Sequence, residues 1–345
     1  MTTEEDYTID DLRETTAVEV AHQTTGSSMT SSTSRGAGFY FNCAVLVVGV
    51  VGSAANGLVL YAMVAAKQYK KQILIFNQNA LDFVSCLFWF IKYALALSNI
   101  YLSGTSGYWL CLTLLGDTVT YAAFVGSLIN LAAISIERYL KIVHNVWAKE
   151  KLRNWMIYST VAFTWISGII CTCALHIPTT FVANGVCYSD IFHLSPTGRK
   201  AYWIWDFVSF CVTDLLIFIN CCGRILVAIR LQARVMADHS GHGSNTVQDQ
   251  SNKIQTSIIK TMILVSVLFA VTLGPAYIYT FLLFFVQATI DENHLFTVLS
   301  IGYLYISINP FIYATKFDPV RRILLGLIPC KTNVHTPSPQ SGANS

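Results

Sequence analysis

Long stretches without a charged side chain constrain this chain more than any other feature. No Asp, Glu, Lys or Arg occurs at 36–66, 154–189, 261–290 or 293–315, which are runs of 31, 36, 30 and 23 residues. An α-helix needs about 20 mostly apolar residues to cross the hydrocarbon layer of a bilayer. Charged residues make up only 12% of the chain, whereas a soluble domain carries about a quarter. The sequence therefore predicts a protein that crosses a membrane several times.

Windows of suitable length and apolarity predict seven spanning helices. They cover 39–65, 73–97, 110–143, 155–177, 202–231, 258–286 and 294–315. Runs such as 44–48 are continuously apolar and do not alternate, which favours helices over the strands of a β-barrel. We predict an all-α membrane protein, a seven-transmembrane helix bundle at 39–315 followed by a short amphipathic eighth helix that lies on the membrane lipid at 316–330.

Basic residues predict the orientation of this bundle. Of the 22 Lys and Arg residues, 17 lie before spans two, four and six or after span seven, four lie on the opposite side, and Lys92 lies inside a span. Cytoplasmic loops are enriched in Lys and Arg. We expect an extracellular N-terminus and a cytosolic C-terminus in the plasma membrane. The first 38 residues lack the pattern of a cleavable signal peptide, so we expect the first span to direct insertion.

The segments outside the bundle have polar compositions. Residues 1–38 are acidic and rich in Ser and Thr, which predicts disorder. Tyr7 lies between acidic pairs in a setting that suits sulfation, although we favour a merely solvating tail. Residues 236–252 read as a flexible loop and 331–345 as a cytosolic tail. Cys330 follows the amphipathic segment directly and is a candidate for palmitoylation.

Ten cysteines are present, and their positions favour a single disulfide. Seven fall inside the predicted spans, where a thiol behaves as a small apolar group. Only Cys111 and Cys187 lie on the predicted oxidising side, at the top of span three and in the loop after span four. The sequence therefore predicts a Cys111–Cys187 bridge.

Polar side chains inside the spans are costly in lipid and are functional candidates. Asp82, Ser127 and Asn309 lie near mid-depth in spans two, three and seven, and with Asn56 we expect them to surround water or a small cation such as sodium. The inner end of span three carries Glu137-Arg138-Tyr139. Prolines that remove a helical hydrogen bond occur in spans six and seven, at Pro275 and Pro310.

These residues together resemble the rhodopsin-like (class A) G-protein-coupled receptors between residues 39 and 330. The resemblance rests on Asn56, Asp82, Glu137-Arg138-Tyr139, Trp165, Pro275 and Asn309-Pro310-x-x-Tyr313. It implies a non-enzymatic receptor for an extracellular ligand, which couples to a heterotrimeric G protein through the switch residues Glu137, Arg138, Tyr139, Pro275, Asn309, Pro310 and Tyr313. It also implies arrestin and receptor kinases as further partners, no cofactor, and sodium as a modulator.

The chain departs from the family pattern at several switch positions. Leu273-Gly274 stand before Pro275 in place of a tryptophan, and Asp214 and Cys222 replace a proline and a tyrosine of span five. Gln255 occupies the place of the acid that would pair with Arg138. We therefore predict appreciable signalling without ligand.

Candidate pocket residues lie in the outer halves of the spans: Lys92, Asp117, Thr120, Tyr121, Tyr277 and Tyr303. An opsin needs a lysine where Tyr303 stands, and an amine receptor an aspartate where Thr120 stands. Both ligand classes are disfavoured, and a peptide or a neutral small molecule fits better. We favour a structural Lys92–Asp117 ion pair over ligand contact by either residue.

Three other functions remain as alternatives. A receptor-like scaffold or decoy that does not couple is compatible with the altered spans five and six. A channel or proton transporter is less favoured because no internal repeat occurs, and a membrane enzyme because no catalytic motif does. The formal net charge of +3 is too small to indicate a nucleic-acid partner.

Overall fold

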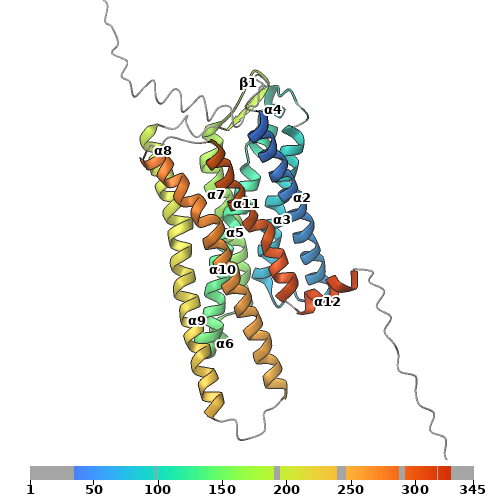
Figure 1. Cartoon of the computed structure of the whole chain (residues 1–345), viewed down its shortest axis with the longest axis vertical. Helices are drawn as coiled ribbons and strands as arrows, with labels where there is room; N and C mark the ends of the chain where they lie inside the picture. Colours follow the sequence, from blue (N-terminus) through green and yellow to red (C-terminus); the bar gives the residue numbers. More distant parts are fainter. Residues whose placement is uncertain are drawn as a thin grey trace, which may run out of the picture.

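The computed structural model describes residues 35–96, 98, 100–189, 195–238, 246–286, 292–316 and 318–327. These residues form a bundle of long helices that run side by side (Figure 1). The long helices are α2 (Arg35–Ala65), α3 (Ile73–Ala96), α5 (Thr118–Val143), α7 (Asn154–Thr179), α9 (Thr213–Asp238), α10 (Thr246–Val286) and α11 (Glu292–Lys316). The predicted all-α membrane bundle is confirmed.

Six helical stretches of the described chain are long and apolar enough to cross a membrane. They are Cys43–Ala65, Ile73–Leu95, Gly104–Val143, Asn154–Thr179, Thr197–Leu231 and Ile263–Leu282. Helix α11 occupies the place of the predicted seventh span and packs against α2, α3 and α10. Its 25 residues include buried polar side chains at Ser307 and Asn309.

Two of the predicted spans are interrupted helices. The third consists of α4 (Gly104–Leu110), the π-helix η1 (Cys111–Leu115) and α5, with Asp117 at φ 63° between the last two. Asp tolerates this left-handed conformation as a single residue. The fifth consists of α8 (Pro196–Asp206), the π-helix η3 (Phe207–Val212) and α9. Such π segments interrupt the regular helical ladder and frequently accompany functional sites.

A β-hairpin covers one end of the bundle, next to α4 (Figure 1). Strands β1 (Thr180–Ala183) and β2 (Val186–Ser189) pair antiparallel around Asn184 and Gly185, whose φ angles are 53° and 78°. An Asn-Gly pair is the preferred sequence for such a two-residue turn, so the sequence contains a local signal for this hairpin, although no hairpin was predicted there. We call this end of the bundle the hairpin end.

The predicted disulfide is confirmed. It joins Cys111 in η1 to Cys187 in β2 with an S–S distance of 2.02 Å. The backbone N–H of Leu102 also donates to the carbonyl of Gly185 over 2.9 Å. The hairpin is therefore attached to the helices both covalently and by hydrogen bonding.

The opposite end carries a short helix, α6 (Asn145–Lys151), and α12 (Asp318–Leu327), which packs against α2 and α11. Helices α9 and α10 extend beyond their neighbours here (Figure 1). The prediction of a flexible loop at 236–252 was too wide. Residues 236–238 continue α9 and 246–252 belong to α10, while 239–245 lie outside the described residues.

The core lies where α3, α5, α9, α10 and α11 meet. Phe269 is fully buried there, and its ring packs edge-on against Phe218 and Tyr305 at 5.2 and 5.8 Å between centroids. Many large apolar side chains of α2 and α7 instead point outward, such as Val47 and Ile170. An outward apolar surface of this kind suits contact with lipid rather than water.

Candidate functional site

The centre of the bundle contains a buried carboxylate with several donors. Asp82 of α3 is inaccessible to solvent. Its Oδ1 accepts a 2.6 Å hydrogen bond from the Ser127 hydroxyl of α5, and its Oδ2 accepts a 3.1 Å bond from the Asn309 amide of α11. The structure thus brings together three of the four residues expected in the polar cluster.

Asn56 does not join this cluster directly. Its amide donates to the backbone carbonyls of Gly52, one helical turn away, and Ile306 in α11, at 3.0 and 3.2 Å. Its place around a shared water or cation therefore stays a prediction.

Gln78 takes the fourth place in the cluster. Its amide donates to both carboxylate oxygens of Asp82, at 3.3 and 3.4 Å, and to Ser127. Its carbonyl accepts a 2.8 Å hydrogen bond from Asn130, which also donates to the carbonyl of Leu74. Gln78 was not among the predicted cluster residues, and its signal in the sequence is a glutamine inside a predicted span one helical turn before Asp82.

The network continues toward α7. Asn77 donates to the side chains of Asn130 and Thr164 at 2.9 and 3.2 Å, and accepts a 2.9 Å bond from the indole of Trp165. Polar side chains thus link α3, α5, α7 and α11 through the middle of the bundle. Such a network favours one arrangement of the helices because each buried polar group has a defined partner.

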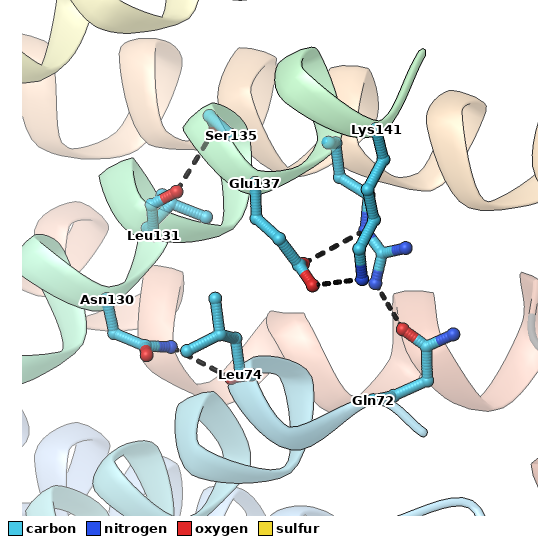
Figure 2. Close-up of polar contacts among 8 residues, drawn as sticks. Gln72, Leu74, Asn130, Leu131, Ser135, Glu137 and Lys141 are labelled. Carbon is cyan, nitrogen blue, oxygen red and sulfur yellow. Dashed lines mark hydrogen bonds and ion pairs between the residues drawn. The ribbon is translucent and has the colours of Figure 1, made fainter. Parts of the chain in front are cut away.

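Arg138 and Glu137 lie near the opposite end of α5 from the hairpin. Each is 8% exposed. The Nε of Arg138 lies 3.5 Å from a carboxylate oxygen of Glu137, and its guanidinium donates to the Gln72 side chain. Glu137 also pairs with Lys141 one turn further along α5. Figure 2 shows Gln72 reaching these residues from the segment that precedes α3.

The other expected switch residues are placed as follows. Tyr139 is hydrogen-bonded to the His144 ring at 3.0 Å, Pro275 and Pro310 lie inside α10 and α11, and Tyr313 is 5% exposed. The two prolines lie in helices that pack against each other.

The expected ion pair in the hairpin half of the bundle is present between Lys92 of α3 and Asp117. The side chains are 17% and 30% exposed, and Oδ1 of Asp117 has no hydrogen-bond partner in the described structure. Asp117 precedes α5, and its unusual backbone conformation places it at the break in the third span.

The other candidate pocket residues lie in α5, α10 and α11. The Thr120 side chain is buried, and its backbone carbonyl accepts a 3.3 Å bond from Ser85. Tyr121 lies with its ring 5.9 Å from that of His176 in α7, and Tyr277 of α10 is 8% exposed. The side chain of Tyr303 lies outside the described residues, as do Tyr7 and Cys330.

The sequence of this chain matches a known protein family. The model of the 7 transmembrane receptor (rhodopsin family) matches residues 55–313, about three quarters of the chain. The match includes Asp82, Arg138 and Pro310.

The chain belongs to the rhodopsin family of seven-transmembrane receptors.

Its similar relatives include melanopsins, at low identity. Melanopsin of Podarcis siculus is 26% identical over 305 residues, which cover 83% of this chain and 61% of the relative. Melanopsin-B of Gadus morhua is 23% identical over 310 residues, covering 83% and 47%, and melanopsin of Felis catus is 25% identical over 302 residues, covering 83% and 60%. The chain thus spans about half to three fifths of the length of these relatives.

Among solved structures, squid rhodopsin shares the fold. The TM-score is 0.67 at 15% sequence identity, over 84% of this chain and 85% of the squid protein. The seven-helix architecture expected from the sequence is therefore that of a solved member of the rhodopsin family.

This receptor differs from the family pattern at positions that the structure places in the core. Leu273 is buried before Pro275. Asp214 is 4% exposed in α9, and the Cys222 sulfur lies 3.9 Å from the hydroxyl of Ser266. Gln255 is part of α10, and its side chain lies outside the described residues.

Proposed function

We propose that this receptor transmits the binding of an extracellular ligand to a heterotrimeric G protein. The observation that supports this most directly is the set of partners around Arg138. It is held by an acid of its own helix and by the neutral amide of Gln72. A guanidinium with such partners can exchange them for groups of a bound protein at a modest cost in free energy.

The helix rearrangement we propose uses the prolines. Pro275 and Pro310 each remove a backbone hydrogen bond from a spanning helix, so α10 and α11 bend more easily at these points than elsewhere. The network around Asp82 connects α11 to α3 and α5. A ligand that binds one arrangement of these helices better by a few kcal/mol shifts the population substantially.

The ligand we propose is a peptide or small molecule bound without a covalent bond. Melanopsins are among the relatives, yet α11 of this chain contains no lysine before Lys316, at the end of the helix, and Tyr303 occupies the place where an opsin needs one. A retinal Schiff base of the opsin kind cannot form there. Lys92 is already paired with Asp117.

Guanine-nucleotide exchange tests this function. Membranes containing the receptor are mixed with purified heterotrimeric G proteins, with and without a ligand library, and nucleotide exchange is measured. We expect basal exchange above that of Arg138→Ala, and the matched variant Lys141→Ala to retain most of it. If nucleotide exchange with the unmodified receptor equals that with Arg138→Ala under all conditions, the result would favour a scaffold that does not couple. This is the main alternative because Leu273 and Asp214 depart from the family pattern.

We propose that the hairpin end faces outward and that α12 lies on the cytosolic side of the plasma membrane. The support is the distribution of basic residues. In α12, Val320 is buried, Ile323 and Leu324 pack against the core, and Arg321 and Arg322 are exposed, as in a helix that lies in the headgroup plane. Epitope tags at the two ends, stained in intact and permeabilised cells, test this orientation.

We also propose sodium as a modulator at Asp82. The carboxylate, the Ser127 hydroxyl and Oδ1 of Asn309, which is buried and has no partner in the described structure, are oxygen ligands of the kind that hard cations prefer. A bound sodium ion would supply positive charge opposite Asp82. Thermal stability measured in sodium and in N-methylglucamine tests this, and we expect the difference to disappear in Asp82→Asn.

A further inference from the structure

The amide of Gln78 lies at the centre of the bundle, against the oxygen atoms that a cation at Asp82 needs. Its nitrogen lies 3.3 and 3.4 Å from the two carboxylate oxygens of Asp82 and donates to the hydroxyl of Ser127. Gln78, Asp82 and Ser127 are all inaccessible to solvent. A group within hydrogen-bond distance of all three oxygen atoms occupies the space where their lone pairs meet.

A carboxamide can present either its nitrogen or its oxygen to a site, with opposite consequences for a cation. The NH2 group only donates hydrogen bonds, and its hydrogens carry partial positive charge. The carbonyl oxygen is itself a ligand for hard cations. Which of the two faces Asp82 therefore decides whether Gln78 opposes or assists a cation, and the orientation follows from the hydrogen-bond partners of the amide.

The neighbouring residues of α3 and α5 set the orientation of Gln78. Its Oε1 accepts a 2.8 Å hydrogen bond from Nδ2 of Asn130. The same nitrogen of Asn130 donates over 3.0 Å to the backbone carbonyl of Leu74, which can only accept (Figure 2). The nitrogen of Asn130 is thus fixed on the side of Gln78. The carbonyl of Gln78 must then face Asn130, and its NH2 group must face Asp82.

A second constraint on the same orientation comes from α7. The indole of Trp165 can only donate, and it donates to Oδ1 of Asn77 over 2.9 Å. Nδ2 of Asn77 therefore faces α5 and donates to Oδ1 of Asn130 over 2.9 Å. The series of donors runs in one direction, from the indole to the carboxylate of Asp82. A reversed Gln78 would leave two donors facing each other and two acceptors facing each other.

We propose that Gln78 competes with sodium for Asp82 and lowers the affinity of this receptor for the ion. The amide must turn away from Asp82 and Ser127 before their oxygen atoms are free, and this movement breaks hydrogen bonds to a charged acceptor. The apparent affinity falls in proportion to the fraction of molecules in which the site is free. The inference rests on the proposed sodium site and names the residue that sets its affinity.

Stabilisation by sodium measures this competition without a ligand or a G protein. The thermal stability of purified receptor in lipid nanodiscs is recorded over a range of NaCl concentrations, with N-methylglucamine chloride keeping the ionic strength constant. The dissociation constant for sodium follows from the dependence of stability on its concentration. We expect this constant to be at least tenfold lower for Gln78→Met than for the unmodified receptor. Methionine keeps the length of the side chain but donates no hydrogen bond to Asp82.

Asn79→Leu is the matched control. Asn79 is a buried amide next to Gln78 in α3, and it donates to the backbone carbonyl of Ile75 over 2.8 Å. We expect this variant to bind sodium with the affinity of the unmodified receptor. An equal rise in affinity in both variants would overturn the proposal, because a general loosening of α3 would explain it. The unfolding temperature without sodium shows whether each variant is folded, and Gln78→Leu takes the place of Gln78→Met if the latter does not fold.

Three other results would overturn the proposal, and they separate it from the sodium site itself. Equal affinity in the unmodified receptor and in Gln78→Met, lost in Asp82→Asn, would keep the sodium site and remove the role of Gln78. A lower affinity in Gln78→Met would show that Gln78 binds the cation through its oxygen. No stabilisation by sodium in any variant would overturn the sodium site together with this inference.

Discussion

Three aspartates buried in the spanning helices have different environments. Asp82 accepts hydrogen bonds from Ser127, Asn309 and Gln78. The Oδ2 atom of Asp214 is buried without a hydrogen-bond partner among the described residues, and Asp206 faces a cavity. At the scale of one residue, the stabilising contribution of a carboxylate is therefore set by its donors rather than by its burial.

We expect Asp82→Ala to lower the free energy of unfolding by about 1–3 kcal/mol for each donor that it leaves without an acceptor. Asp214→Ala removes the same number of atoms and no described hydrogen bond, so we expect it to be neutral or stabilising. Thermal unfolding of the two variants in detergent measures the difference. Equal losses of stability would show that the network around Asp82 contributes little.

At the scale of elements, how closely two helices pack depends on the size of the side chains where they meet. Helices α5 and α7 approach each other at Gly168, where an added Cβ would lie 2.2 Å from the Ala122 carbonyl oxygen. Gly223 in α9 has nothing within 4 Å of such an atom. The same residue type is thus required in one helix and replaceable in another.

We expect Gly168→Ala to destabilise the receptor by about 1–3 kcal/mol, because the two helices must move apart. The matched substitution Gly223→Ala is expected to stabilise by up to about 1 kcal/mol, because alanine favours the helix. Unfolding temperatures of the purified variants test whether Gly168→Ala lowers the stability and Gly223→Ala raises it. A neutral Gly168→Ala would show that α5 and α7 can separate without cost.

The hairpin is the other element whose attachment can be tested. The disulfide joins residues 76 positions apart. Closing a loop of this length lowers the conformational entropy of the unfolded chain and so raises its free energy by about 4.5 kcal/mol. We expect Cys187→Ser to lower thermal stability strongly and to reduce the surface expression of the receptor. Cys43→Ser, which alters an exposed free cysteine, provides the control and is expected to leave both unchanged.

At the scale of the whole molecule, the balance between helix arrangements depends on what holds Arg138. Its described partners are Glu137 in its own helix and the neutral Gln72. In the family pattern an acidic residue of the sixth span stands at the position where this chain has Gln255. Among the described side chains, none of α10 forms an ion pair with Arg138.

We expect Gln255→Glu to lower ligand-independent nucleotide exchange several-fold, because an ion pair of about 1–2 kcal/mol between helices favours the closed arrangement. Gln248→Glu adds the same charge two turns earlier in α10 and serves as the control. Exchange that stays unchanged in Gln255→Glu would indicate that other contacts set the basal activity.

The number, order and approximate bounds of the spanning helices were predictable from the sequence, as were the Cys111–Cys187 bridge and the Lys92–Asp117 pair. Apolar length and charge distribution are local properties of the chain, and together they determine which segments enter a bilayer and in which orientation. The hairpin turn at Asn184-Gly185 had a sequence signal of the same local kind.

Which polar groups meet inside the bundle was decided only by the tertiary structure. Ser127 and Asn309 reach Asp82 across 45 and 227 residues, and those contacts depend on how each helix is rotated and shifted against its neighbours. The breaks before α5 and α9 change that rotation. No pattern in the sequence indicates that Gln78 contacts Asp82 or that Asp206 faces a cavity, because both depend on how the helices are rotated in the assembled bundle.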